Sequence, residues 1–274
     1  SWHTYRWEAG GMAVLGSIQP QPVETQPGGT LRLADIAAAI KPDDPHFART
    51  RLVVLENTTG GQVLPTPYIA EVAALARARG LAMHLDGARL FNAATANAQA
   101  NASDVYDEAR AICAHFDTVS LCLSKGLGAP VGSLLLGSHG FIRQARRTRK
   151  ILGGSMRQAG VLAAAGHYAL EHHVRRMADD HALLRQLADG LQAAQRTQAA
   201  LQGRLLVHPA QTNILFTDIA PDIAPAFAEA LARGGVRVTS SLYGGQTRLR
   251  WVTHLDVGPA DVRAALDCVQ AFAG

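Results

Sequence analysis

Residues 119–128 read VSLCLSKGLG, a short apolar run followed at once by a lysine and two glycines. The run predicts a buried strand over Val119–Leu123 that ends where Lys125 begins a tight turn. A lysine in this place is unusual, because an uncompensated buried ammonium is costly. Such a site favours the neutral amine, the form that attacks carbonyl carbon. A structural lysine whose stem lies along apolar surface is the alternative interpretation.

Similar elements flank this run on both sides. Upstream we expect strands over Leu52–Leu55 and Leu81–Leu85, with a helix from Thr66-Pro67 to Gly80 between them. A helix-rich, alanine-rich stretch covers residues 88–115, and a further strand is expected over Val131–Leu136. This alternation of strands and helices predicts an α/β fold with a mostly parallel sheet.

Beyond residue 138 the pattern becomes helical and then mixed. A basic helix is expected over Phe141–Lys150, and an almost continuous helix over residues 158–194. Short strands and helices then alternate, over 205–207, 214–216, 223–233, 236–239, 249–252 and 260–273. We therefore predict a large domain over residues 1–160, and a connecting helix with a small C-terminal α+β domain over 161–274.

Polar side chains gather where the predicted strands end. In open α/β sheets, ligands bind beyond the carboxyl ends of the strands. That rule selects Glu56-Asn57, Asp86, Arg89 and Lys125. Asp86 by itself is equally well explained as a helix N-cap. Together, a lysine for an imine, an aspartate for a pyridinium nitrogen and arginines for a carboxylate form the protein side of pyridoxal-phosphate chemistry.

Several other classes of site are disfavoured. Lys125 precedes its glycines, whereas a P-loop needs the reverse order, and the glycine spacing misses the dinucleotide fingerprint. Three widely spaced cysteines favour a reducing cytoplasm over a disulfide framework, and no pair has zinc-ligand spacing, so no metal site is expected. A net charge of +4 without interleaved aromatic residues does not indicate nucleic-acid binding. No apolar run is long enough for a membrane span.

Five stretches resemble one family, the low-specificity L-threonine aldolases, in the family's order and from His3 almost to the C-terminus. They are EAGGMAVLGS (8–17), HLDGARLFNA (84–93), SLCLSKGLGAPVGSLLLG (120–137), GGSMRQ (153–158) and RWVTHLD (250–256). The resemblance implies an aminotransferase-like fold type I enzyme that depends on pyridoxal 5'-phosphate. The implied reaction is retro-aldol cleavage of L-threonine or L-allo-threonine to glycine and an aldehyde.

The resemblance also implies roles for particular residues. Lys125 would form the imine with the cofactor, Asp86 would pair with its pyridinium nitrogen, and His3 would stack on its ring. Arg89 and Arg250 would clamp the substrate carboxylate. Lys150 and Arg157 match basic residues near the active site, which separates them from an otherwise solvated basic helix face. The base that takes the β-hydroxyl proton would be His3 or a water molecule that it holds. The family's usual assembly implies a homotetramer, a dimer of dimers, acting on a small amino acid.

The sequence departs from the family at three places. Thr59 stands where relatives typically carry a histidine near the substrate hydroxyl, which leaves the preference between threo and allo substrates open. Residues 94–110 look like an insertion. Relatives have several dozen residues before the equivalent of His3, including a loop that holds the cofactor phosphate, so we expect the sequence to be a piece of a longer one. The alternatives are a β-eliminating lyase of the same fold type, or an inactive chain that only binds partners.

Overall fold

The computed structural model describes residues 2–243 and 245–273; Ser1, Gly244 and Gly274, which belong to the predicted domains, lie outside it. The chain forms two compact units, residues 1–174 and 175–274. The helix α8 (Gly160–His172) belongs to the first unit. The boundary between the units therefore falls after residue 174 in the sequence, whereas it was predicted after residue 160. Each unit is described by itself.

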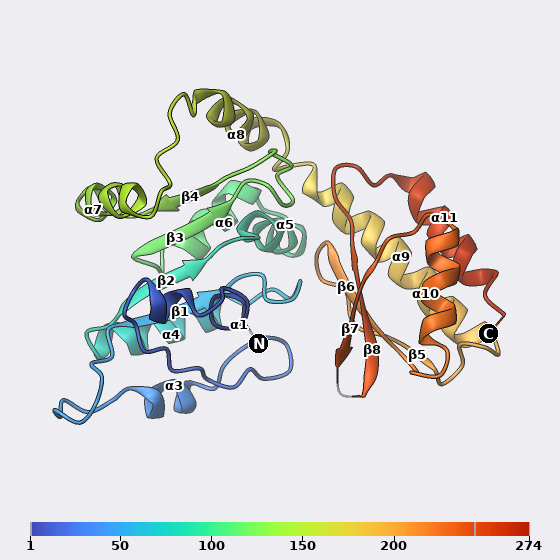
Figure 1. The fold of residues 1–274 in the computed structure, drawn as a ribbon, viewed down its shortest axis with the longest axis horizontal. Helices are drawn as coiled ribbons and strands as arrows, with labels where there is room; N and C mark the ends of the chain where they lie inside the picture. The colour runs from blue at the N-terminus through green and yellow to red at the C-terminus, as the bar shows by residue number, and fades with distance from the viewer. Residues whose placement is uncertain (1, 244, 274) are drawn as a thin grey trace. The chain divides into compact units, whose positions relative to one another are not determined.

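A four-stranded sheet forms the centre of the first unit, in the order β1-β2-β3-β4 (Figure 1). Its strands are β1 (Leu52–Glu56), β2 (Ala82–Asp86), β3 (Thr118–Cys122) and β4 (Ser133–Leu136). The first three are parallel, and β4 is antiparallel to β3. The mostly parallel sheet expected from the sequence is therefore confirmed, and each strand lies within two residues of its predicted start.

The two faces of this sheet differ in character, because successive side chains of a strand point to opposite sides. One face carries the buried residues Leu55, Met83, Leu85, Val119 and Leu121. The neighbouring helices are α4 (Thr66–Ala78), α5 (Leu90–Asn101) and α6 (Val105–Cys113), of which α4 contacts β2 and α6. The opposite face is polar and half-buried, with side chains that include Glu56, His84, Asp86, Thr118 and Ser120.

Helices α5 and α6 contain the stretch that looks like an insertion. They pack against each other, with Phe91 and Tyr106 in an edge-to-face contact at 6.1 Å between ring centroids. Asp104 caps α6, since its carboxylate accepts the backbone N–H of Tyr106 at 2.8 Å. Residues 94–110 are thus the body of a helical pair beside the sheet.

Short helices and loops precede β1: α1 (His3–Arg6), α2 (Gly11–Val14) and α3 (Leu33–Ala39). After β4 comes the basic helix α7 (His139–Ile151), which has no buried residue. The prediction of an almost continuous helix over 158–194 is wrong. Residues 173–176 separate α8 from α9 (Met177–Thr197), and α9 lies in the second unit.

The second unit is an antiparallel sheet with helices α9, α10 (Ala224–Arg233) and α11 (Pro259–Gln270). Its strand order is β5-β6-β8-β7, with bounds Leu205–Val207, Ile214–Ile219, Gln246–Val252 and Thr239–Tyr243 respectively. The strand predicted near 236–239 actually begins at Thr239, because Gly234-Gly235 and Val236 form the end of α10 through backbone hydrogen bonds. Leu184, Leu191, Phe227 and Trp251 are buried in its core.

Over the described ranges, 2–243 and 245–273, the structure contains no helix with the length and apolarity that a membrane crossing requires.

Candidate active site

The carboxyl ends of the three parallel strands bring Glu56, Asp86 and Ser120 into one row. Glu56 is the register partner of Asp86, and Asp86 is the register partner of Ser120. The backbone continues the ladder past the strands, since Asn57 N–H donates to the Asp86 carbonyl and Gly87 N–H donates to the Ser120 carbonyl. The row is therefore fixed by main-chain pairing and by side-chain alternation, which place these three side chains on the polar face.

Asp86 has one carboxylate oxygen committed to the fold. Its Oδ1 accepts the backbone N–H of Ala88 at 3.1 Å and shapes the turn into α5. The N-cap position of α5 is Arg89, so Asp86 is not the N-cap. Within the described residues its Oδ2 has no hydrogen bond. A donor such as a protonated ring nitrogen can bind there.

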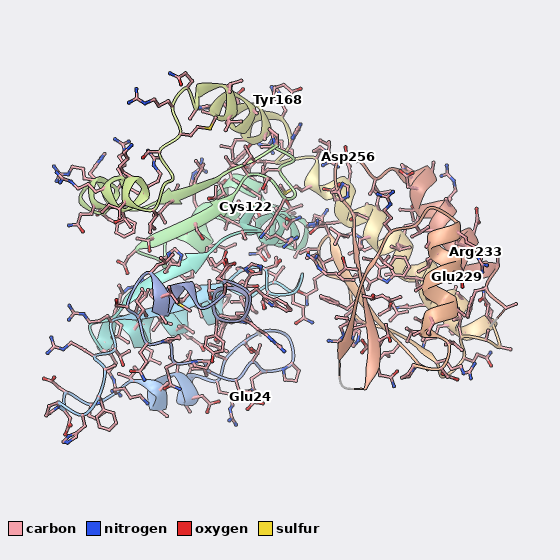
Figure 2. All side chains as sticks on the ribbon, in the orientation of Figure 1. Glu24, Cys122, Tyr168, Glu229, Arg233 and Asp256 are labelled. Carbon is pink, nitrogen blue, oxygen red and sulfur yellow. The ribbon has the colours of Figure 1, made fainter. Side chains whose placement is uncertain are left out.

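Lys125 lies in the loop after β3, and backbone hydrogen bonds close that loop tightly. Ala129 N–H donates to the Leu123 carbonyl, and Gly128 N–H donates to the Lys125 carbonyl at 2.9 Å. Gly128 has φ +70°, a conformation that side chains disfavour. Figure 2 shows Cys122 at the end of β3, three residues before the lysine.

The Lys125 side chain is half-buried, and its amine makes no hydrogen bond or ion pair to any residue in the described part of the chain. A purely structural role for Lys125 is therefore not supported by any ion pair among the described residues.

Arg89 follows Asp86 by three residues and is half-buried, with its Nε atom wholly inside the protein. Arg89 is the N-cap residue of α5, on the turn that follows Asp86. Asp86, Arg89 and Lys125 therefore all belong to the segments that leave the carboxyl ends of β2 and β3.

His3 reaches the same edge from a distant part of the sequence. Its backbone N–H donates to Glu56 Oε2 at 2.5 Å. Its ring Nδ1 lies 2.5 Å from Glu8 Oε1, and both side chains are about half exposed. A hydrogen bond from Nδ1–H to this carboxylate leaves the lone pair on Nε2, the nitrogen that can then accept a proton.

Burial and neighbouring charges alter the acidity of two groups on this face. Burial raises the pKa of Glu56, and the nearby Asp86 carboxylate adds to that increase. The hydrogen bond from His3 and the charges of His3 and Lys125 act in the opposite direction. Burial lowers the pKa of His84, whose Nδ1 lies 2.8 Å from Thr118 Oγ1. The edge is thus partly desolvated, which strengthens electrostatic interactions made there.

Thr59 lies three residues beyond Glu56, half-buried, and exchanges two backbone hydrogen bonds of 2.9 Å with Gln62. The preceding Asn57 is buried and accepts the backbone N–H of Leu64 through Oδ1. These bonds fix the backbone of the loop that carries Thr59.

The remaining predicted site residues lie elsewhere. Lys150, in the last turn of α7, and Arg157, in the loop that follows, are exposed and are not joined to Asp86 or Lys125 by any contact that the described residues show. Arg250 lies on β8 in the second unit, where burial lowers the pKa of its half-buried guanidinium. No ion-pair partner for Arg250 is present among residues 2–243 and 245–273.

Glu8 was not predicted as a site residue, and Glu56 was noted only as a group at a strand end. Glu8 sits in a stretch without helical or strand periodicity, so its contact with His3 depends on how the N-terminal segment folds back. For Glu56, the available signal in the sequence was its place at the end of a predicted parallel strand, the same place that Asp86 has in the next strand.

The residues of the first unit fit part of a pyridoxal-phosphate site. Among the described residues the amine of Lys125 makes no hydrogen bond or ion pair, and Asp86 keeps one carboxylate oxygen for a pyridinium N–H. A cluster of three or more histidine, cysteine or acidic side chains that could hold a metal ion is absent from the residues that the model describes.

The chain is similar to several known proteins. The model of the beta-eliminating lyase family matches residues 1–220. The chain is 45% identical to the low specificity L-threonine aldolase of Escherichia coli K12 over 93% of this chain and 70% of that protein. It is 39% identical to a probable low-specificity L-threonine aldolase 2 of Arabidopsis thaliana, over 98% and 73% of the two chains. The structure of Leishmania major threonine aldolase superposes with a TM-score of 0.78 at 19% identity, covering 99% of this chain and 75% of that one.

Proposed function

The chain belongs to the beta-eliminating lyase family, and from that premise we propose that it cleaves L-threonine or L-allo-threonine to glycine and an aldehyde. Its architecture is the expected aminotransferase-like fold type I, and its cofactor is pyridoxal 5'-phosphate. The observation that carries the proposal is the edge of the parallel sheet, where the Lys125 amine and the Asp86 Oδ2, neither hydrogen-bonded to another described residue, lie on adjoining segments.

The residues of the first unit would hold the cofactor. Lys125 would bind it covalently through Nζ, and Asp86 would keep the proton on its ring nitrogen by a charge-assisted hydrogen bond. His3 would contact the cofactor ring. When bound, pyridoxal phosphate accepts the electron pair released as the Cα–Cβ bond of the substrate breaks.

Guanidinium groups orient the substrate. Arg89 and Arg250 bind the carboxylate of the amino acid, each through a planar pair of N–H donors. The absence of an ion-pair partner for Arg250 within the described residues supports this role, because a half-buried guanidinium needs an anion. Lys150 and Arg157, both exposed, are proposed to lie near the substrate because they match basic residues near the active site of the family.

The proton of the β-hydroxyl goes to His3 or to a water molecule that His3 holds. The contact between Nδ1 and Glu8 leaves Nε2 as the accepting atom. Glu8 also stabilises the positive charge that the ring gains on protonation, in the manner of a carboxylate that orients a general base.

Product analysis tests the function directly. The purified protein, supplied with cofactor, is incubated with L-threonine and separately with L-allo-threonine. We expect glycine and acetaldehyde in equal amounts. A 2-oxo acid and ammonia would identify a β-eliminating lyase instead. No product, with the cofactor not retained, would identify a chain that only binds partners.

A homotetramer, a dimer of dimers, is also proposed. Its support is the exposed apolar surface of β4 and the helices after it, since large exposed apolar patches are typical of interfaces. Leu135 and Leu136 are 44% and 47% exposed, and Val161 on α8 is 73% exposed. Light scattering during gel filtration would test this, and a monomer at micromolar concentration would contradict it. The three unpaired cysteines support a reducing compartment, the cytoplasm, which fractionation of the native host would test.

A further inference from the structure

The Glu56 side chain links two parts of the candidate active site that are 53 residues apart. It ends β1, where it is half-buried, and its Oε2 accepts the backbone N–H of His3 at 2.5 Å. None of the roles assigned above to the substrate, the cofactor or the proton uses this carboxylate.

The helix that carries His3 has little structure of its own to hold it. α1 has four residues, none of them buried, and its N-cap residue, Trp2, makes no side-chain cap hydrogen bond. The first N–H groups of a helix have no acceptor inside the helix. For the His3 N–H, Glu56 is that acceptor, and the neighbouring Trp2 is buried.

Two carboxylates thus control His3 in different ways. Glu8 contacts Nδ1 and sets how the ring is turned and which nitrogen carries the proton. Glu56 fixes where the residue lies, because the main chain of His3 is bound to the end of β1. Asp86 is the register partner of Glu56, so the same hydrogen bond holds His3 beside the cofactor-binding edge.

We propose that Glu56 is a positioning residue that holds His3 at the carboxyl edge of the parallel sheet through a hydrogen bond to its main chain. The functional part of this inference depends on the proposed role of His3, whereas the hydrogen bond does not. The bond is strongest with an ionised acceptor. Burial is the main reason that the pKa of Glu56 is raised, although His3 and Lys125 act in the opposite direction, and protonation of Glu56 as the pH falls weakens this hydrogen bond.

The direct test is amide hydrogen exchange at His3, measured on the full chain with cofactor bound, in three variants. Glu56→Ala removes the acceptor, and we expect the protection of the His3 N–H to fall about tenfold. Glu56→Gln keeps a neutral oxygen acceptor, so we expect protection between that of the parent chain and that of Glu56→Ala, without a decline at acidic pH. Glu71→Gln, on an exposed position of α4, is the matched control and should behave as the parent chain does.

A kinetic cycle with His3→Ala gives the second readout. Glu56→Ala should lower kcat about tenfold with little change in KM, and it should have almost no further effect once His3 is replaced. Additive effects of the two substitutions, or unchanged protection of the His3 amide in Glu56→Ala, would overturn the inference. Failure of the proposed function is distinct, since it would appear as absent glycine in the parent chain while the amide protection still depended on Glu56.

Discussion

Gly87 donates its backbone N–H to the carbonyl oxygen of Ser120 at 2.9 Å, and the same oxygen would lie only 2.7 Å from a β-carbon at residue 87. The strands β2 and β3 therefore approach each other at the candidate site so closely that a side chain at position 87 does not fit. Asp86 and Lys125 lie on the two segments that this contact holds together.

We expect Gly87→Ala to separate these segments. Overpacking against a backbone atom costs about 1–3 kcal/mol, and the displaced Asp86 should also weaken cofactor retention. Gly160→Ala is the control, because a β-carbon there meets nothing within 4 Å. Thermal unfolding and dialysis against cofactor-free buffer measure both effects. Equal behaviour of the two variants would show that the close approach is unimportant.

Lys125→Ala should abolish covalent attachment of the cofactor, because no other amine takes its place at the end of β3. The measurement is the intact mass after borohydride reduction, followed by a peptide map. Lys41→Ala is the control, since Lys41 precedes β1 and lies outside the edge of the sheet. A reduced adduct that persists in the Lys125 variant would refute the assignment.

Arg250→Ala should chiefly weaken binding of the amino acid carboxylate. Charge-assisted hydrogen bonds contribute about 1.5–3 kcal/mol, so KM should rise roughly ten- to a hundredfold, with cofactor attachment unchanged. Arg233→Ala is the control. Arg233 is exposed on α10, and its guanidinium lies 3.4 Å from the carboxylate of Glu229. Figure 2 labels both residues. If KM does not change in the Arg250 variant, that guanidinium takes no part in the clamp.

His181 should make the second unit sensitive to acid. It is wholly buried on α9, and burial, helped by Arg185, lowers its pKa to about 4. Above the unfolded pKa of about 6.5 the histidine is neutral in both states. Between that pH and about 4 only the unfolded state takes up a proton, so stability is lost as the pH falls.

From pH 7 to pH 5 this loss amounts to about 2 kcal/mol. Urea unfolding at the two pH values measures it, with His181→Gln expected to show a smaller pH dependence than the parent chain. The exposed His139→Gln should leave the pH dependence unchanged. If the His181 variant loses as much stability at pH 5 as the parent chain does, protonation of His181 is not the cause of the acid sensitivity.

The local sequence determined the parallel strands and their polar ends. Short aliphatic runs that stop at Glu56, Asp86 and Lys125 define both the sheet and its functional edge, because parallel strands end on one side. Five stretches, among them the one around Lys125, also indicated the family, because each is contiguous in the sequence. Helix ends that carry no proline or paired glycines are harder to predict from the sequence. The interruption at residues 173–176 between two helices was therefore not predicted.

Tertiary structure alone decided which distant groups meet at that edge. Nothing in the spacing of His3, Glu8 and Glu56 predicts that one carboxylate contacts the ring and the other the main chain. Those contacts depend on the path by which the N-terminal segment returns to β1, which is set by packing and by unsatisfied backbone donors. Sequence pattern therefore determined the strands and their chemistry, and three-dimensional packing determined how the histidine is held beside them.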